Sequence, residues 1–254
     1  MQIPDSAKAL IDTELQQLAK SSRYYLPPQG RLEIYAALGP SSAHDDKVPE
    51  EARKNNSFPP LSLADRIRAQ VALITARKVL PLWELACQET ESFFTKQDWQ
   101  IKYDDQRNKE EVYLHRRKSR PIETISVYEV PRAFVPVHIL EMTELALAGE
   151  IHDYSAFRRE ANEWWQIYGR PEQVEREFFI KWAAQDALYE AIGWIKYNPE
   201  EPPAENALYA FAGVFKGEDW HNRKCTLDEK KQHEFWVWWL AEAIPQVFAE
   251  DYLS

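Results

Sequence analysis

The segment from Thr226 to Glu250, TLDEKKQHEFWVWWLAEAIPQVFAE, decides the fold, because its apolar residues form the wall that other helices need. Thr226 is followed three residues later by Glu229, and this capping-box pattern predicts the start of a helix. Pro245 lacks an N–H group and crowds the carbonyl four residues back, so it predicts a kink or an end one turn early. Apolar side chains recur at helical spacing and occupy one broad face, formed by Phe235, Trp236, Trp239, Leu240, Ala243, Ile244 and Val247.

The rest of the chain is predicted to be helical as well. Ten tryptophans in 254 residues indicate a substantial core, since each indole ring removes a large apolar area from water. No repeat period is evident, so we expect an all-α, irregular multi-helix bundle in a single domain spanning residues 1–254. Periodicity, caps and prolines place its other helices at residues 5–21, 31–38, 62–80, 82–94, 137–148, 153–168, 171–198 and 208–215.

Two segments depart from the helical pattern. Residues 40–60 are polar and bounded by prolines, which is typical of a mobile surface loop. Residues 98–131 contain two short runs in which apolar and polar side chains alternate, around Val112 and around Ile125. This alternation predicts a short β-hairpin or an extended insertion.

The helix at residues 62–80 has apolar positions on almost every side, so it is expected to be central. Arg68 and Arg77 lie within it, and a buried guanidinium needs a carboxylate. Asp186 lies in the middle of the apolar face of the helix at residues 171–198. We therefore predict a structural ion pair between Asp186 and either Arg77 or Arg68.

No motif in the chain makes a positive case for an enzyme. There is no glycine-flanked serine and no phosphate-binding glycine loop, and His233-Glu234 fails the HExxH pattern because residue 237 is valine. His221, Cys225 and His233, with Asp219, match no standard zinc spacing. The helices also lack the Glu-x-x-His pairs of carboxylate-bridged metal sites. We expect no cofactor, no metal and no catalytic residues.

The expected compartment is the cytoplasm. Cys87 and Cys225 match no paired spacing, the N-terminal sequence does not resemble a secretory signal, and no apolar run is long enough to span a membrane. The dense basic run at residues 115–120 is neutralised by acidic neighbours, so we do not expect nucleic-acid binding.

Acidic charge is concentrated in the second half of the chain. The formal net charge is −10, and residues 132–254 supply all of it, with 22 acidic and 12 basic side chains. This imbalance favours a basic partner or a cation, although ordinary solvated helix faces would also produce it.

Part of this acidic half is a candidate binding surface. Trp238 lies opposite the apolar face of its helix, and aromatic anchors ringed by charge are common where proteins bind one another. Packing of Trp238 against another helix of the same chain is the alternative. The predicted partner-binding residues are Trp238, Trp220, Glu200, Glu201, Glu205, Glu218 and Asp219.

Two segments resemble the Imm5 family of bacterial immunity proteins. Residues 235–245, FWVWWLAEAIP, resemble the C-terminal signature of that family, and residues 77–84, RKVLPLWE, resemble its N-terminal signature. The order of the two segments and the helical sequence between them also fit, over about residues 61–248. Residues 98–131 depart from what is expected between the signatures. The matching residues are mainly structural, so no binding residues are carried over.

The resemblance implies an antitoxin that binds and occludes a cognate toxin domain. The acidic charge of the chain leads us to expect a basic surface on that toxin, and we expect the protein to be a monomer or weak homodimer. Two other hypotheses remain open on the residues alone. One is a helical scaffold or self-associating module, which predicts a stable homo-oligomer. The other is an enzyme with an unrecognised carboxylate or metal site, which predicts a stoichiometric metal in the purified protein.

Overall fold

The computed structural model describes residues 1–20, 25–40, 61–83, 108, 111–125, 129–130, 134–151, 176–193, 204–215 and 225–249. Within these ranges the chain is almost entirely helical. Its labelled α-helices are α1 (Asp5–Lys20), α2 (Pro28–Ala37), α4 (Leu63–Val79), α7 (Val135–Ala148), α9 (Arg176–Ala191), α10 (Glu205–Ala212), α11 (Glu229–Trp238) and α12 (Ile244–Ala249). The predicted all-α fold is therefore confirmed.

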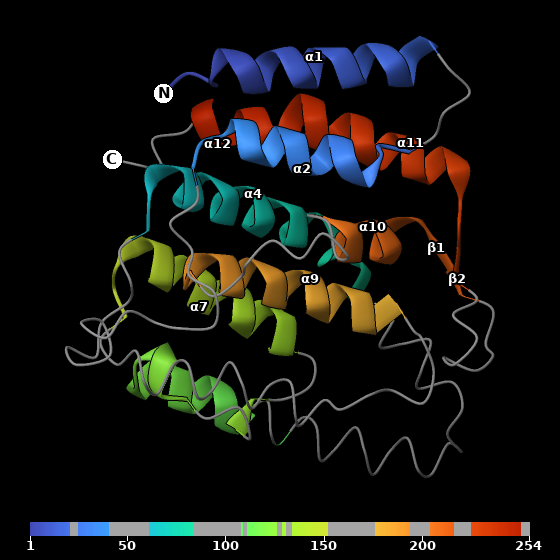
Figure 1. The fold of residues 1–254 in the computed structure, drawn as a ribbon. Helices are drawn as coiled ribbons and strands as arrows, with labels where there is room; N and C mark the ends of the chain where they lie inside the picture. Colours follow the sequence, from blue (N-terminus) through green and yellow to red (C-terminus); the bar gives the residue numbers. More distant parts are fainter. Residues whose placement is uncertain are drawn as a thin grey trace.

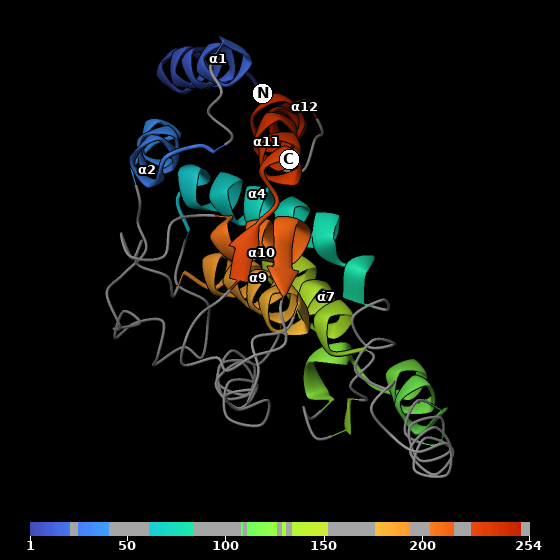
Figure 2. The same cartoon turned by 90° about the vertical axis from the view of Figure 1, so that its right-hand side faces the viewer.

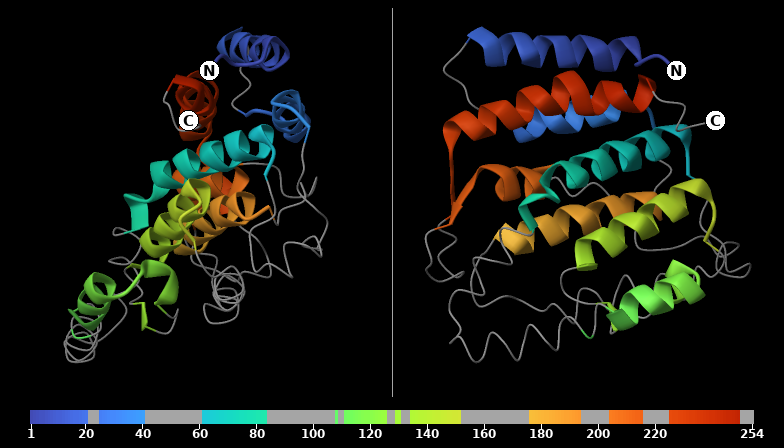
Figure 3. Two further views of the ribbon diagram at one scale, coloured as in Figure 1. Left: turned by 90° about the vertical axis from the view of Figure 1, so that its left-hand side faces the viewer. Right: turned by 180° about the vertical axis from the view of Figure 1, so that it is seen from behind.

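The helices are stacked in layers with their axes roughly aligned (Figure 1). Helix α1 lies on one outer side, next to a layer made of α2 and the closing segment α11–α12. The views from the two sides show α4 running beneath both parts of this layer, with α9, α10 and α7 on its far side (Figures 2 and 3).

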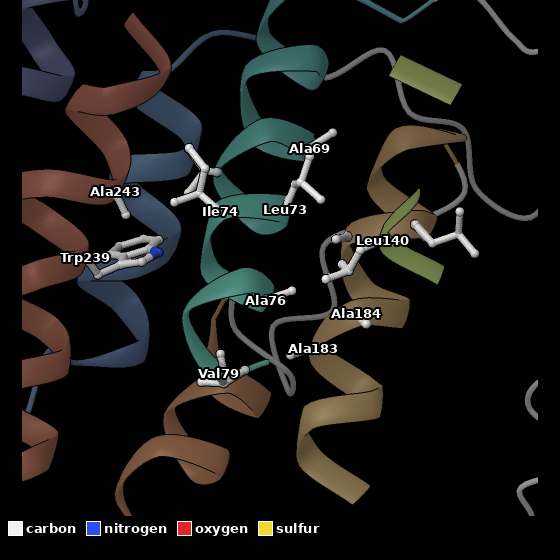
Figure 4. Packing of buried hydrophobic residues seen from close by; sticks show 14 of the residues in the cluster. Ala69, Leu73, Ile74, Ala76, Val79, Leu140, Ala183, Ala184, Trp239 and Ala243 are labelled. Carbon is white, nitrogen blue, oxygen red and sulfur yellow. The ribbon is translucent and has the colours of Figure 1, made fainter. Parts of the chain in front are cut away.

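Helix α4 is the centre of the molecule, as its sequence predicted. Ser62 caps it, because its Oγ accepts a hydrogen bond from the backbone N–H of Asp65 at 3.1 Å. Twelve of its 17 residues are buried. Trp239 and Ala243 of the closing segment approach α4 from one side, and Ala184 of α9 lies on the other (Figure 4). Small side chains such as Ala184 allow α4 and α9 to pack closely.

The closing segment begins later than predicted. Asp228 is the N-cap of α11, and its Oδ1 accepts from the backbone N–H of Lys231 at 2.9 Å. The predicted capping box of Thr226 and Glu229 is wrong, because Thr226 pairs with Val214 in a β-strand instead. The helix can start only where the strand ends, and Asp228 is the first good capping residue after it.

Replacing Asp228 with alanine should lower the free energy of unfolding by about 1 kcal/mol, because the first turn of α11 loses the acceptor for one backbone N–H group. Urea denaturation followed by circular dichroism measures the change. Thr226→Ala is the matched control, since Thr226 lies in strand β2 and the N-cap of α11 is Asp228, and it should cost less. An equal or larger loss for Thr226→Ala would show that the cap is assigned to the wrong residue.

The closing segment does not end early at Pro245. Trp239–Ala243 forms a π-helical turn, η5, in which the backbone N–H of Ile244 bonds to the carbonyl of Trp239. Helix α12 then continues to Ala249. In a regular α-helix the Pro245 ring would crowd the carbonyl of Ala241. The distortion predicted at the proline therefore takes the form of a wide turn immediately before it.

The strands lie away from the predicted position. Strand β1 (Gly213–Phe215) pairs antiparallel with β2 (Cys225–Leu227), between α10 and α11. Residues 111–119, where alternation predicted a strand, are helical, and a 3₁₀ turn, η1, follows at Ile122–Thr124. The hairpin expected near residues 98–131 is thus wrong over its described part. In this helix Tyr113 is buried, and the apolar residues Val112 and Leu114 are exposed. The alternation of apolar and polar residues therefore does not mark the buried face of a strand.

Some predictions lie outside the described residues, namely the loop at residues 41–60, the helix at residues 153–168 and most of the helix at residues 82–94. Among the helices that the structure describes, none combines the length and the apolar character that crossing a bilayer requires.

Candidate functional site

The two segments that carry the family resemblance lie side by side. The first segment begins in the last turn of α4, which contains residues 77–79, and α11 and η5 contain most of the second segment. Trp239 Nε1 donates to Thr75 Oγ1 across this contact at 3.2 Å, and both side chains are buried. Lys78 follows Thr75 by three residues, and its ammonium lies 4.7 Å from the centre of the ring of Trp238, the residue before Trp239.

We call the exposed Lys78 and the half-buried Trp238 the Trp238 surface. Trp238 is half-buried, and its ring lies 5.7 Å from that of Phe235, which is fully buried. Trp238 therefore packs against its own chain, and its role in binding a partner stays a prediction. A lysine above an indole face contributes a cation–π attraction of about 0.5–1 kcal/mol at an exposed site.

Of the predicted acidic binding residues, the structure describes Glu205 alone. Glu205 is the first residue of α10. Burial lowers the pKa of the Arg31 guanidinium, and the negative charge of Glu205 opposes this by raising it. Arg31 in turn lies over the Trp236 ring, 4.9 Å from its centre. Glu205 thus belongs to a partly buried polar group inside the fold. The other predicted binding residues lie outside the described residues: Glu200, Glu201, Glu218, Asp219 and Trp220.

The ion pair predicted for Arg77 is wrong. Arg77 is exposed and pairs with Glu144 of α7. The reason is helical geometry, because Arg77 follows Arg68 by nine residues, or two and a half turns, so the two arginines lie on opposite faces of α4. Only Arg68 faces the core.

Arg68 fixes the end of α2 to α4. Its guanidinium is 1% exposed and bonds to Asp65 Oδ1 at 3.0 Å. It also donates to the carbonyl of Tyr35 from Nε at 3.2 Å and from Nη2 at 2.9 Å, and to the carbonyl of Gly39. The last carbonyls of a helix lack partners within it. Arg68 supplies such partners from a neighbouring helix.

Asp186 belongs to the same neighbourhood. Its Oδ2 accepts from Asn206 Nδ2 of α10 at 2.8 Å. The charges of Asp186 and Arg68 both act on the Tyr35 hydroxyl and on Glu190, in opposite directions. A direct bond between Arg68 and Asp186 stays a prediction.

Glu190 is a residue of this group that sequence reasoning missed. Burial raises its pKa from 4.5 to about 8, Arg68 opposes the rise, and Asp186 and Asp65 add to it. The sequence held a signal for it, because Glu190 follows Asp186 by four residues and so shares its helix face.

Glu190→Gln is expected to stabilise the protein as pH rises. Between about pH 4.5 and 8 the folded protein keeps a proton on Glu190 that the unfolded chain has lost, so wild-type stability falls over this window. Glutamine removes that loss. The variant should match the wild type near pH 5 and exceed it by about 2 kcal/mol above pH 8, allowing for partial exposure. Urea denaturation across this pH range measures the difference, and a constant difference would contradict the assignment.

A second polar group joins helix 111–119 to α7. The Tyr113 hydroxyl lies 3.0 Å from Nδ1 of His138, and both side chains are fully buried. Burial raises the pKa of Tyr113 to about 12; burial, and then the charge of Arg117, lower that of His138 to about 3. Arg117 pairs with Glu141. Part of the basic run at residues 115–120 therefore holds its own helix to α7, through the ion pair of Arg117 with Glu141.

Among the described residues, no three histidine, cysteine, aspartate or glutamate side chains lie close enough to hold a metal ion. Asp219 and His221, two of the four residues considered for zinc, are outside that part of the chain. The described residues offer an aromatic surface at Trp238 and buried charged groups around Arg68.

A search of protein-family models found no match to this chain, and a search of the curated proteins found none either. The resemblance to the Imm5 family therefore rests on the two segments quoted above.

Proposed function

We propose that this protein is an immunity protein, which binds a cognate bacterial toxin domain in the cytoplasm and blocks it by occlusion. The observation that carries the proposal is the position of Trp238. It lies where the two segments that resemble the Imm5 signatures pack together, and it is an indole of this contact that stays partly accessible. Half-buried tryptophans of this kind are common binding anchors, since much of their ordering is already achieved in the free protein.

Charge supports the same proposal. The excess of acidic side chains in residues 132–254 would attract a toxin with a basic surface and increase the rate of association. The Trp238 surface itself carries a lysine. We assign the acidic contribution to Glu200, Glu201, Glu218 and Asp219, whereas Glu205 is better regarded as a structural residue because its charge acts on Arg31.

The experiment is a binding assay with the product of the neighbouring gene. A stoichiometric complex, together with protection of cells that express that product, is expected. Absence of both binding and protection would remove the proposal. A stable homo-oligomer of this chain, with no affinity for the neighbouring product, would favour the scaffold hypothesis instead.

Trp238→Ala is expected to weaken toxin binding by about 2 kcal/mol, or roughly thirtyfold in Kd, because the anchor loses its contact area. Isothermal titration calorimetry measures the change. Tyr25→Ala is the matched control, since it removes an exposed aromatic ring from the segment before α2. Circular dichroism must show that both variants remain folded. Equal affinity in the two variants would move the interface away from Trp238.

A second variant tests the charge. Replacing Glu200 and Glu201 with lysine should lower the association rate and reduce its dependence on salt, because steering acts on encounter more than on the formed complex. An association rate that does not change would show that the acidic half contributes nothing to steering.

A further inference from the structure

A buried arginine of α2 carries hydrogen-bond donors that the protein leaves without acceptors. Arg31 is 4% exposed, and it forms no ion pair with any residue that the structure describes. Its Nε and Nη1 are both fully buried, and neither has a hydrogen-bond acceptor among the described residues. Burying a donor without a partner is unfavourable, most of all when the group is charged. The guanidinium therefore needs an acceptor from elsewhere.

The aromatic neighbour of Arg31 adds a further donor. The guanidinium carbon lies 4.9 Å from the centre of the Trp236 ring, and this contact joins α2 to α11 within the layer above α4 (Figure 2). Trp236 is fully buried, and its indole Nε1 likewise has no acceptor within the described part of the chain. Both sides of one buried contact thus present N–H groups for which the described protein supplies no oxygen.

Glu205 supplies negative charge to Arg31 from α10, but only from a distance. The two side chains form no ion pair, and no oxygen of Glu205 bonds to Nε or Nη1. Glu205 is partly exposed, so water and salt screen its charge. Its attraction therefore helps to keep Arg31 charged without filling the need of the guanidinium for a hydrogen-bond acceptor.

The chemistry of the donors selects the kind of acceptor that suits them. The face of the Trp236 ring attracts the guanidinium by a cation–π interaction, but it cannot accept the N–H of its own indole. A water molecule accepts two hydrogen bonds, but it brings two hydrogens that need acceptors of their own. A small anion accepts several hydrogen bonds, donates none and balances the buried positive charge. An anion is therefore the acceptor that fits this set of donors.

We propose that Arg31 and Trp236 form a binding site for one small monovalent anion such as chloride, between α2 and α11. The proposal is independent of the toxin-binding function. The anion accepts hydrogen bonds from the guanidinium of Arg31 and from Nε1 of Trp236, and it thereby links α2 to the closing segment. Its role is to stabilise the fold, because it binds donors that only the folded protein brings together.

The test is thermal unfolding of the full chain, exchanged into chloride-free buffer and then titrated with sodium chloride or with sodium gluconate. Equal ionic strength in the two series removes the effect of screening. Chloride should raise the Tm of the wild type by about 3–5 °C more than gluconate does, once its concentration is about ten times Kd, and the rise should saturate.

Three variants locate the effect. Arg31→Met should lose the chloride-specific rise in Tm, because it removes the cationic donors and keeps most of the volume. Trp236→Phe removes only the Nε1–H group, so it should raise the half-saturating chloride concentration about tenfold. Arg77→Met makes the same chemical change as Arg31→Met at an exposed position of α4, and it should keep the full rise.

Equal responses of the wild type to chloride and gluconate would overturn the proposal. So would a chloride-specific rise in Arg31→Met as large as that of the wild type. If Arg31→Met does not fold, crystals of the wild type soaked in sodium bromide decide the matter by anomalous scattering. A bromide ion in hydrogen-bond contact with Nε or Nη1 of Arg31 is expected, whereas bromide found only elsewhere would mean an adventitious ion only and would reject the site.

Discussion

Replacing Arg68 with methionine is expected to lower the free energy of unfolding by about 3–5 kcal/mol. Methionine fills most of the same volume, so the loss comes from the polar groups left behind. Asp65 would remain buried without its cation, and the carbonyls of Tyr35 and Gly39 would lose the hydrogen bonds that Arg68 donates to them. Urea denaturation at neutral pH measures the loss.

Arg77→Met is the matched control, because it makes the same chemical change on the same helix. Arg77 pairs with Glu144 at the surface, and such pairs contribute about 0–1 kcal/mol. Adding Asp65→Asn to Arg68→Met should recover about 1 kcal/mol, because it removes the stranded charge. If both single arginine variants cost the same, the buried bonds of Arg68 do not hold α2.

Trp239→Ala should cost about 3–5 kcal/mol, the range measured for large aromatic side chains removed from cores. Trp239 is fully buried between Tyr35, on which it stacks, and Trp236, whose ring meets it edge-on at 5.6 Å. It also donates its N–H to Thr75. Its removal opens a cavity where the closing segment, α2 and α4 meet, and denaturation with near-ultraviolet circular dichroism reports both stability and packing.

Two comparisons divide this loss into parts. Trp239→Phe keeps an aromatic ring but loses the N–H donor, and it should cost about 1–2 kcal/mol. Trp238→Ala, one residue away, removes a half-buried ring and should cost less than Trp239→Ala. A larger loss at Trp238 than at Trp239 would show that the apolar face of the closing segment has been assigned to the wrong side.

The sequence was sufficient for the elements whose signals are local. Apolar spacing placed α4 and the closing segment, and Ser62 marked the start of α4 correctly because its cap depends on residues three positions away. The N-cap is Asp228 and not the predicted Thr226, because Thr226 pairs with Val214 in the sheet. Strand pairing is non-local, so no pattern within residues 226–229 could reveal it.

Parts of the candidate site could have been predicted with a closer use of geometry. The half-turn offset between Arg68 and Arg77 was readable from the sequence, and so was the shared face of Asp65 and Arg68, three residues apart. The role of Arg68 as a donor to α2 could not be read, because it depends on how two helices cross. The raised pKa of Glu190 could not be read from the sequence either, because the burial that raises it arises only when α9 packs in the folded protein.

The wide turn before Pro245 has a consequence for how such helices are recognised. Adjacent buried residues recur in pairs at every fourth position along the closing segment: Phe235 and Trp236, Trp239 and Leu240, Ala243 and Ile244, Val247 and Phe248. Four residues of a 3.6-residue helix turn about 40° beyond one full turn, so in a regular helix each pair would be rotated further and the last pairs would face solvent. The π-helical turn holds an extra residue and so cancels this rotation. Pairs of adjacent apolar residues that recur every four positions should therefore indicate a locally underwound helix in other chains, with or without a proline.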